Sequence, residues 1–239
     1  MASTLKDKRV LVVGRGSGLA RAITEAARAA GATVTAAGRH AEELADVYDH
    51  DPGVSAESVD LTDDDSIAGL ARRVGAVDHV VSTASARARG MIGDLERDAV
   101  RRSFDTKVIG PLMLARAFRG QINDGGSIVI FSGVAAFDIE PGTLAVAITN
   151  GAADTLTRSL AVELAPIRVN AISPGAIDTG AWDALGEDGK AKLFAEKRER
   201  NPARRIGAPE DIGDAAILAM TNTFMTGLTL HVDGGERLT

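Results

Sequence analysis

Short runs of apolar, β-branched residues alternate with longer amphipathic segments along almost the whole chain. Val10–Val13 is the first such run, and an alanine-rich segment with helical spacing follows it as far as Ala30. Apolar runs bounded by turn residues are typical of buried parallel strands, and a 3.6-residue period is typical of helices that cover a sheet. We therefore expect strands at 10–13, 32–37, 54–59, 77–82, 127–131, 167–172 and 228–232.

The amphipathic segments between these strands are expected to form helices. After the segment that ends at Ala30, they are 41–48, 63–74, 96–121 with an interruption near Gly110-Pro111, 144–164, 182–200 and 209–220. Repeated strand–helix units with right-handed crossovers build a parallel sheet whose ligand cleft lies at the carboxyl ends of the strands. The pattern predicts an α/β fold: a doubly wound, parallel, seven-stranded Rossmann-type sheet with helices on both faces, in a single dinucleotide-binding domain over 1–239.

The turn after the first strand is rich in glycine and has the strand–turn–helix setting in which dinucleotides bind. Gly14 and Gly16 allow a tight reversal and a close approach to a pyrophosphate. Gly18 allows the helix to pack near the strand while its first N–H groups face the anion. An ordinary turn that happens to contain glycines is the alternative. The other expected cofactor contacts in this loop are Arg15, Ser17 and Leu19.

The position about 20 residues beyond the glycine loop distinguishes the two common dinucleotides, because NAD-binding chains carry an acidic residue there for the ribose hydroxyls. Here Gly38 and Arg39 follow the second expected strand. The guanidinium of Arg39, together with Arg15, suits a 2′-phosphate because arginine binds phosphate through paired hydrogen bonds. The sequence therefore predicts NADP(H). The alternative is that both arginines are solvated surface groups.

Composition narrows the function classes. The 239 residues are 45% hydrophobic and 25% charged, which suits one large α/β domain. The chain has no cysteine, which excludes disulfides and thiol catalysis, and its four histidines are scattered without ligand spacing, so no metal site is expected. A net charge of −6 offers no attraction for nucleic acid or an anionic membrane. Because the chain starts without an apolar signal region, we expect a cytoplasmic protein.

Several stretches, in order along the chain, resemble the short-chain dehydrogenase/reductase family. They are Gly14–Leu19, Asp60-Leu61, Arg168–Gly175 with Ile177 and Thr179 after it, and Thr226–Gly235. The resemblance implies an oxidoreductase that acts on a small molecule, with 181–205 as a helical insertion that covers an apolar or ring-bearing substrate. The further cofactor contacts that it implies are Asp60, Leu61, Thr83, Ala84, Pro174, Gly175, Ile177 and Thr179.

The chain departs from this family at the usual catalytic residues. Relatives carry tyrosine and lysine four apart on the helix after the fifth strand, where this chain has Val146 and Asn150. The usual serine corresponds to Gly133. Tyr48 is the only tyrosine and lies on the adenosine side, which excludes proton transfer by tyrosine. The chain is therefore identified as a divergent member that lacks the Ser–Tyr–Lys catalytic residues.

Lysine and asparagine have exchanged places relative to the family. Lys107 stands where relatives have asparagine on the earlier helix, and Asn150 stands where they have lysine on the later one. A partly buried ammonium can give up its proton, so Lys107 is the expected proton donor or oxyanion stabiliser. Asn150 and, in a smaller role, Ser132 are the other candidate catalytic residues, and Lys107 and Asn150 are also expected to contact the cofactor. The alternative is a lysine with a solvated head.

Two expectations concern the surface around the helix 144–164. Asp138 and Glu140, in the loop before it, are expected to be solvated carboxylates. The family resemblance implies a homotetramer or homodimer in which the helices 96–121 and 144–164 pack against their symmetry mates, and small side chains on the second helix would allow close packing. The expected contact residues are Ala147, Gly151, Ala152 and Thr155.

Three function classes are open at this point. The first is an NADPH-dependent carbonyl reductase with an atypical site that uses Lys107 in place of the Tyr/Lys pair. The second is a non-catalytic protein that binds or senses NADP(H). The third is a non-redox lyase or cyclase on the same fold. The retained glycine loop favours the first two, because that loop serves a dinucleotide.

Overall fold

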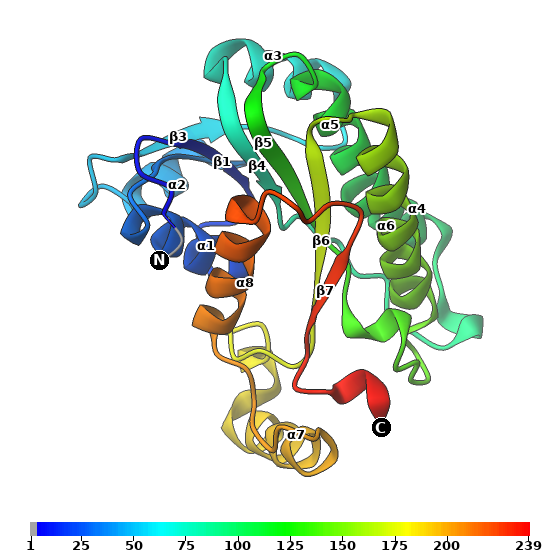
Figure 1. Ribbon diagram of the computed structural model, residues 1–239. Coiled ribbons are helices and arrows are strands. Elements are labelled where there is room, and N and C mark those ends of the chain that lie inside the picture. Colours follow the sequence, from blue (N-terminus) through cyan, green and yellow to red (C-terminus); the bar gives the residue numbers. More distant parts are fainter. Residues whose placement is uncertain (1–3) are drawn as a thin grey trace.

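The computed structural model describes residues 4–239. Its strands are β1 (Arg9–Val13), β2 (Thr33–Gly38), β3 (Val54–Ser58), β4 (Val77–Ser82), β5 (Ile122–Phe131), β6 (Arg168–Pro174) and β7 (Thr229–Val232). All are parallel and form one sheet in the order β3-β2-β1-β4-β5-β6-β7 (Figure 1). The direction of winding reverses between β1 and β4, which is where such sheets hold ligands at their carboxyl edge. The predicted doubly wound α/β fold is confirmed.

Helices cover both faces of this sheet. They are α1 (Gly18–Ala29), α2 (Ala41–Val47), α3 (Asp64–Val74), α4 (Arg97–Phe104), α5 (Gly110–Phe118), α6 (Leu144–Glu163), α7 (Gly186–Arg200) and α8 (Pro209–Thr221). One core lies under α1 and α8 and includes Ile23 and Ala216. The other lies under α3, α5 and α6 and includes Leu70, Leu114 and Leu160. Burial on both faces explains why the strands read as continuous apolar runs.

The long helical segment before β5 does not break where the sequence predicted. α4 passes through a π-helical turn at Asp105–Ile109 directly into α5, which begins with Gly110 and Pro111. Proline lacks an N–H and its ring would clash with the carbonyl four residues earlier, so a wider turn before it allows the helix to continue. Close packing requires glycine at position 110, because a Cβ there would lie 2.8 Å from the Cβ of Leu61.

Two other predicted boundaries differ. β5 starts at Ile122 instead of 127, pairs first with Val77, and then shifts register before its regular part. The predicted helix 182–200 is divided into a short 3-10 turn, η4 (Asp183–Leu185), and α7. Gly186 separates the two with a left-handed φ of 71°, a conformation that glycine adopts without strain. Figure 1 shows α7 beyond the carboxyl ends of the strands.

Two predictions about the surface near α6 are wrong. Ala147 is only 8% exposed, because its position on the helix turns it toward the interior. The Asp138 side chain is only 12% exposed and pairs with cations of α7, whereas Glu140 pairs with the same helix but keeps 43% of its side chain exposed. A loop carboxylate becomes buried in this way when a distant segment supplies its counter-charge.

No helix within residues 4–239 is both long and apolar enough to span a bilayer. The same residues include no cluster of three or more histidine, aspartate or glutamate side chains that could hold a metal ion.

Candidate active site

The glycine loop joins the end of β1 to α1, and other parts of the chain approach its backbone closely. A Cβ on Gly14 would lie 2.2 Å from Oγ1 of Thr83 and 2.7 Å from Cβ of Ala20, so only glycine fits there. α1 begins at Gly18, whose φ of +58° is left-handed. The hydroxyl of Ser17 makes no capping hydrogen bond. The first N–H groups of α1 are therefore available to an anion.

The loop after β6 lies against the glycine loop. A Cβ on Gly18 would be 3.4 Å from Cβ of Thr179, so two segments predicted to hold the cofactor are neighbours. Ile177 is different, because its side chain is 6% exposed and packs in the core under α8. At the start of the loop, a Cβ on Gly175 would lie 2.7 Å from Oε2 of Glu236.

The remaining predicted cofactor residues border the carboxyl edge of β3 and β4. The carboxylate of Asp60 accepts hydrogen bonds from the backbone N–H of Thr62 at 2.9 Å and from its hydroxyl at 2.7 Å. These bonds lower the pKa of Asp60. The Thr83 hydroxyl donates to the carbonyl of Val13 at 3.2 Å, which ties β4 to the glycine loop. Leu61 and Ala84 pack on the core under α3 and α5, and Leu61 is buried.

Arg15 and Arg39 are both exposed, as a 2′-phosphate site requires. Within residues 4–239, the ion pairs and hydrogen bonds of the structure give neither guanidinium a carboxylate partner. The positive charge of Arg39 contributes to the lowered pKa of Asp60, after the hydrogen bonds from Thr62. Two exposed guanidinium groups that form no ion pair among the described residues are suited to bind a phosphate.

The π-helical turn between α4 and α5 carries Lys107 into the interior, where it is 8% exposed. Its Nζ donates to the backbone carbonyl of Ser132 at 2.9 Å. Burial, followed by the positive charge of Arg87, lowers the pKa of Lys107 from 10.5 to about 7, while Asp154 opposes the shift. The ammonium is therefore not a solvated surface group. With a pKa near neutrality it can both give and accept a proton.

Ser132 and Asn150 complete the cluster around Lys107. The hydroxyl of Ser132 donates to the backbone carbonyl of Asn150 at 3.1 Å, and Nδ2 of Asn150 donates to the carbonyl of Gly133 at 3.2 Å. Oδ1 of Asn150 is buried and has no hydrogen-bond partner among the described residues. A buried acceptor left alone costs about 1–3 kcal/mol, so this oxygen is suited to a hydroxyl or N–H of a bound molecule. The three candidate catalytic residues thus lie together.

The predicted departures from the family pattern are physically linked. A Cβ on Gly133 would lie 2.8 Å from Nδ2 of Asn150, so a serine there conflicts with Asn150 in its present rotamer. Val146, one turn earlier on α6, is 7% exposed and presents no polar atom. The hydroxyl proton of Ser132 is committed to the helix backbone. Lys107 is therefore the one side chain of this cluster with a proton that can be given up.

Sequence analysis missed Arg87, in the loop after β4. The carbonyl of Ala86 accepts from the hydroxyl of Ser103 at 2.7 Å, which holds this loop against α4. The Arg87 side chain is exposed, and partial desolvation by its neighbours, followed by the charges of Arg89 and Arg15, lowers its pKa. The signal was present, because Arg87 and Arg89 lie in the loop after a strand whose carboxyl end lines the ligand cleft.

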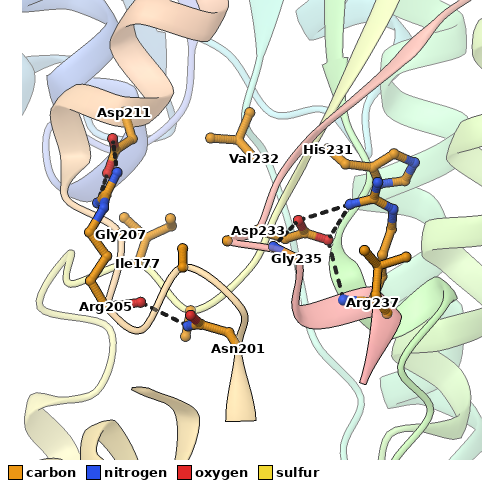
Figure 2. Close-up of a pocket in the computed structure, with 14 residues that line it drawn as sticks. Ile177, Asn201, Arg205, Gly207, Asp211, His231, Val232, Asp233, Gly235 and Arg237 are labelled. Carbon is orange, nitrogen blue, oxygen red and sulfur yellow. Dashed lines mark hydrogen bonds and ion pairs between the residues drawn. The ribbon is translucent and has the colours of Figure 1, made fainter. Parts of the chain in front are cut away.

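A separate cavity of about 410 Å³ lies between the loop after β6, the segment 201–211 and β7 (Figure 2). Two ion pairs stand in its wall, Arg205 with Asp211 at 2.6 Å and Arg237 with Asp233 at 3.0 Å. Ile177 is the one predicted cofactor residue in its lining. Because the charges in the wall are already paired, this cavity does not match the needs of a dinucleotide phosphate.

Known oxidoreductases are similar to this chain over nearly its whole length. The family model described as enoyl-(acyl carrier protein) reductase matches residues 13–236. L-xylulose reductase from Mus musculus is 32% identical over 97% of both chains, and carbonyl reductase (NADPH) 2 from Sus scrofa is 30% identical over 98% of both. A solved structure of a small-chain dehydrogenase in complex with NADPH superimposes with a TM-score of 0.86 at 29% identity, covering 98% of this chain and 100% of that one.

Proposed function

The chain belongs to the short-chain dehydrogenase/reductase family, and we propose that it is an NADPH-dependent oxidoreductase that reduces a carbonyl group of a small molecule. One observation carries the proposal: the buried ammonium of Lys107, with a pKa of about 7, lies in one cluster with the unsatisfied Oδ1 of Asn150. A proton that can be given up and an open acceptor at one place can protonate an alkoxide and hold a hydroxyl.

The residues at the cleft fit NADPH. The first N–H groups of α1 and the exposed Arg15 and Arg39 would hold its phosphates, and Oδ1 of Asn150 would accept a hydrogen bond from a ribose hydroxyl. The carbonyl reductase (NADPH) 2 relative and the neighbour solved with NADPH support the same choice. When bound, NADPH supplies a hydride to the carbonyl carbon.

Lys107 supplies the proton in this proposal. As the carbonyl oxygen gains negative charge, the ammonium stabilises that charge and transfers one proton from Nζ to the oxygen. The neutral amine then takes a proton from water, which restores the starting state. The carbonyl of Ser132, 2.9 Å from Nζ, orients the amine throughout. The pKa of about 7 makes both the transfer and the recharging possible at neutral pH.

A non-catalytic protein that binds or senses NADP(H) is the second candidate. It is favoured by Val146, an apolar, buried side chain at the position where relatives have tyrosine. A non-redox lyase or cyclase is the third and has no observation of its own in its favour. Purified protein mixed with NADPH and a panel of L-xylulose, aliphatic ketones and ring-bearing ketones separates them. Loss of nicotinamide absorbance supports the reductase, whereas binding without turnover supports the sensor.

NADPH should bind more tightly than NADH, and Arg39→Ala should remove most of the difference. Two charge-assisted hydrogen bonds to a phosphate contribute about 10- to 100-fold in affinity. Calorimetric titration of both dinucleotides measures the ratio. Arg72→Ala, which changes an exposed arginine on α3, is the control and should leave the ratio unchanged. Equal affinities in the parent protein would contradict the NADP(H) assignment.

Turnover in the reducing direction should fall as the pH rises through about 7, because Lys107 must be protonated to act as the acid. An Arg87→Gln variant should move the midpoint of this profile upward. The positive charge of Arg87 disfavours the protonated form of Lys107, so its removal raises the pKa of Lys107. Burial still holds that pKa below 10.5. The pH dependence of kcat measures both effects. A profile that is flat across pH 7 would argue against Lys107 as the acid.

The oligomeric state is proposed to be a homodimer or homotetramer that packs through α6. Ile148 and Val162 are 50% and 79% exposed, and with the exposed Thr155 they form a stripe along one side of the helix. Helical spacing places 148, 155 and 162 seven residues apart, on the same face. An exposed apolar stripe of this kind suits contact with a second copy of the chain.

A further inference from the structure

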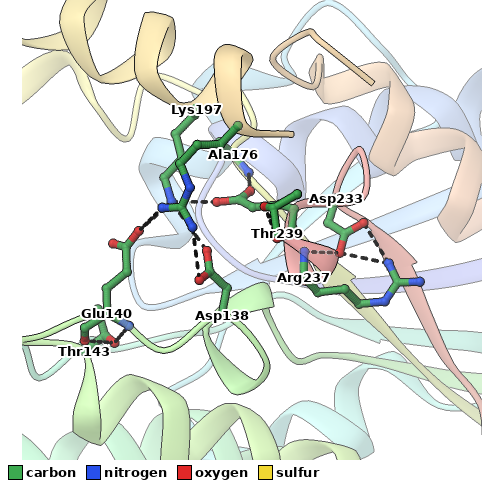
Figure 3. A network of polar contacts seen from close by, with 10 residues as sticks. Asp138, Glu140, Thr143, Ala176, Lys197, Asp233, Arg237 and Thr239 are labelled. Atoms are coloured by element: carbon green, nitrogen blue, oxygen red, sulfur yellow. Dashed lines mark hydrogen bonds and ion pairs between the residues drawn. The ribbon is translucent and has the colours of Figure 1, made fainter. Parts of the chain in front are cut away.

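Five charged side chains meet where α7 approaches the rest of the molecule (Figure 3). Nζ of Lys197 on α7 is 2.7 Å from the carboxylate of Glu236, 3.0 Å from Glu140 and 4.0 Å from Asp138. Arg200, one turn later, is 3.3 Å from Glu140 and 3.5 Å from Asp138. We name these five residues the latch. They join three segments that are far apart in the sequence.

The latch is partly removed from water, which makes its charges interdependent. The side chain of Lys197 is 14% exposed and that of Glu236 only 2%. Burial alone would lower the pKa of Lys197, but hydrogen bonds from its ammonium to Glu236 and Glu140 raise it above the ordinary value. The hydrogen bond from Lys197 lowers the pKa of Glu140. Removal of one partner from such a pair leaves a buried charge without compensation.

Little else holds α7 in place. Of its fifteen residues, Phe194 is the only one that is buried. The helix therefore offers a small apolar contact, and its position depends on polar contacts at its two ends. At the first end, Nζ of Lys190 pairs with Asp178 at 2.8 Å. At the other end stands the latch. Segments with few buried apolar contacts open at low free-energy cost. The latch therefore supplies a large part of the free energy that holds α7 against the rest of the molecule.

The latch also reaches the loop after β6, which contains predicted cofactor contacts. Oε2 of Glu236 accepts a hydrogen bond from the backbone N–H of Ala176 at 3.0 Å, in the loop after β6. The same loop is tied to η4, because Nε1 of Trp182 donates to the carbonyl of Ile177 at 3.1 Å. Glu236 thus contacts both the loop and, through Lys197, the helix that stands beyond the strands.

We propose that the latch holds α7 closed over the substrate site and fixes the loop at Ala176, so that Lys197 and Glu236 are positioning residues for the substrate. The part that concerns substrate rests on the proposed reductase function. The closure of α7 does not, because it can be measured without turnover. Opening of the latch is then the step that admits substrate and releases product.

Two variants and one control test this proposal. Lys197→Met keeps the length of the side chain and removes its charge, and Glu236→Gln keeps an acceptor for Ala176 while it removes the other charge. Lys192→Met changes an exposed lysine on the same helix, for which the structure gives no ion pair, and serves as the control. The double variant Lys197→Met/Glu236→Gln removes both charges, so it should lie closer to the parent than the sum of the single effects predicts.

Hydrogen exchange of 186–200 is the first measurement. In Lys197→Met the opening equilibrium of α7 should rise about a hundredfold, while exchange in β1 and β4 stays as in the parent. Acrylamide quenching of Trp182, the only tryptophan, should increase in the same variant because η4 moves with the helix. In the active enzyme KM for the ketone should rise about tenfold with kcat within about twofold, which a loss of global stability would not produce.

Different results would overturn the latch, its role in positioning substrate, and the proposed function. Unchanged exchange of α7 and unchanged Trp182 quenching in Lys197→Met would overturn the latch. Faster exchange with an unchanged KM would overturn its role in positioning substrate. Should the protein bind NADPH without turning over any ketone, the proposed function fails, and exchange and quenching still decide whether Lys197 and Glu236 hold α7 closed.

Discussion

Lys107→Met should reduce turnover on the order of 10²–10³-fold and, at the same time, make the folded protein more stable. Methionine has a similar length and fills the same buried space, but it can neither donate to a developing alkoxide nor give up a proton. The loss should appear in kcat, because the ammonium is needed most when charge develops on the substrate oxygen. NADPH should still bind, since the glycine loop and Arg39 are untouched.

The gain in stability follows from the pKa of Lys107, which is about 7 in the folded protein against 10.5 for an ordinary lysine. Between these values the unfolded chain binds more protons than the folded one, so the stability of the parent increases as the pH rises from about 7 to about 10.5. The full destabilising effect of the buried charge is present below pH 7. The advantage of Lys107→Met should therefore be largest there and should shrink at higher pH.

One opposing effect limits this advantage. The carbonyl of Ser132 loses the hydrogen bond that it now accepts from Nζ at 2.9 Å. We expect a net gain on the order of 2 kcal/mol below pH 7, after that loss is subtracted. Urea unfolding at two pH values measures it, and Lys192→Met is the matched control. Undiminished turnover would rule out Lys107 as the proton donor, and lower stability in Lys107→Met at acidic pH would rule out the buried ammonium.

The fold was predictable because its information is local. Runs such as Val10–Val13 are buried on both faces of the sheet, so a continuous apolar run in the sequence predicts the strand. The placement of Lys107 beside Ser132 and Asn150 followed from the family resemblance, which assigned these positions to one cleft. The partner of its ammonium could not be predicted, since it is a backbone carbonyl and every residue offers one.

The errors arise where distant segments determine the structure. Asp138 reads as a solvated loop residue, and it is buried only because α7, some sixty residues later, supplies Lys197 and Arg200. Gly110-Pro111 reads as a helix break, and the helix continues because the preceding π turn accommodates the proline. In both cases the local pattern is compatible with two structures; a distant helix selects one for Asp138, and the turn next to Pro111 selects the other.

Gly38→Asp, which supplies the acidic residue typical of NAD-binding chains, should destabilise the protein instead of producing an NADH enzyme. A Cβ at this position would lie 2.6 Å from the carbonyl oxygen of Gly14 and 3.2 Å from Cδ1 of Leu44. The backbone of the glycine loop would have to move, and we expect a loss of about 2–4 kcal/mol in stability. Affinity for either dinucleotide should fall on the order of a hundredfold, because the same loop must cradle the pyrophosphate.

Arg39→Asp is the matched control for this result, because it introduces the same carboxylate one residue later at an exposed position. Its stability should stay within about 0.5 kcal/mol of the parent, as surface substitutions usually do. Its carboxylate repels a 2′-phosphate and accepts ribose hydroxyls, so its preference should turn toward NADH. Thermal unfolding and dinucleotide titration of both variants measure these effects. A Gly38→Asp protein that unfolds like the parent and prefers NADH would show that the glycine loop has room for a side chain at 38, and the close approach of β2 to Gly14 would then not be what excludes one.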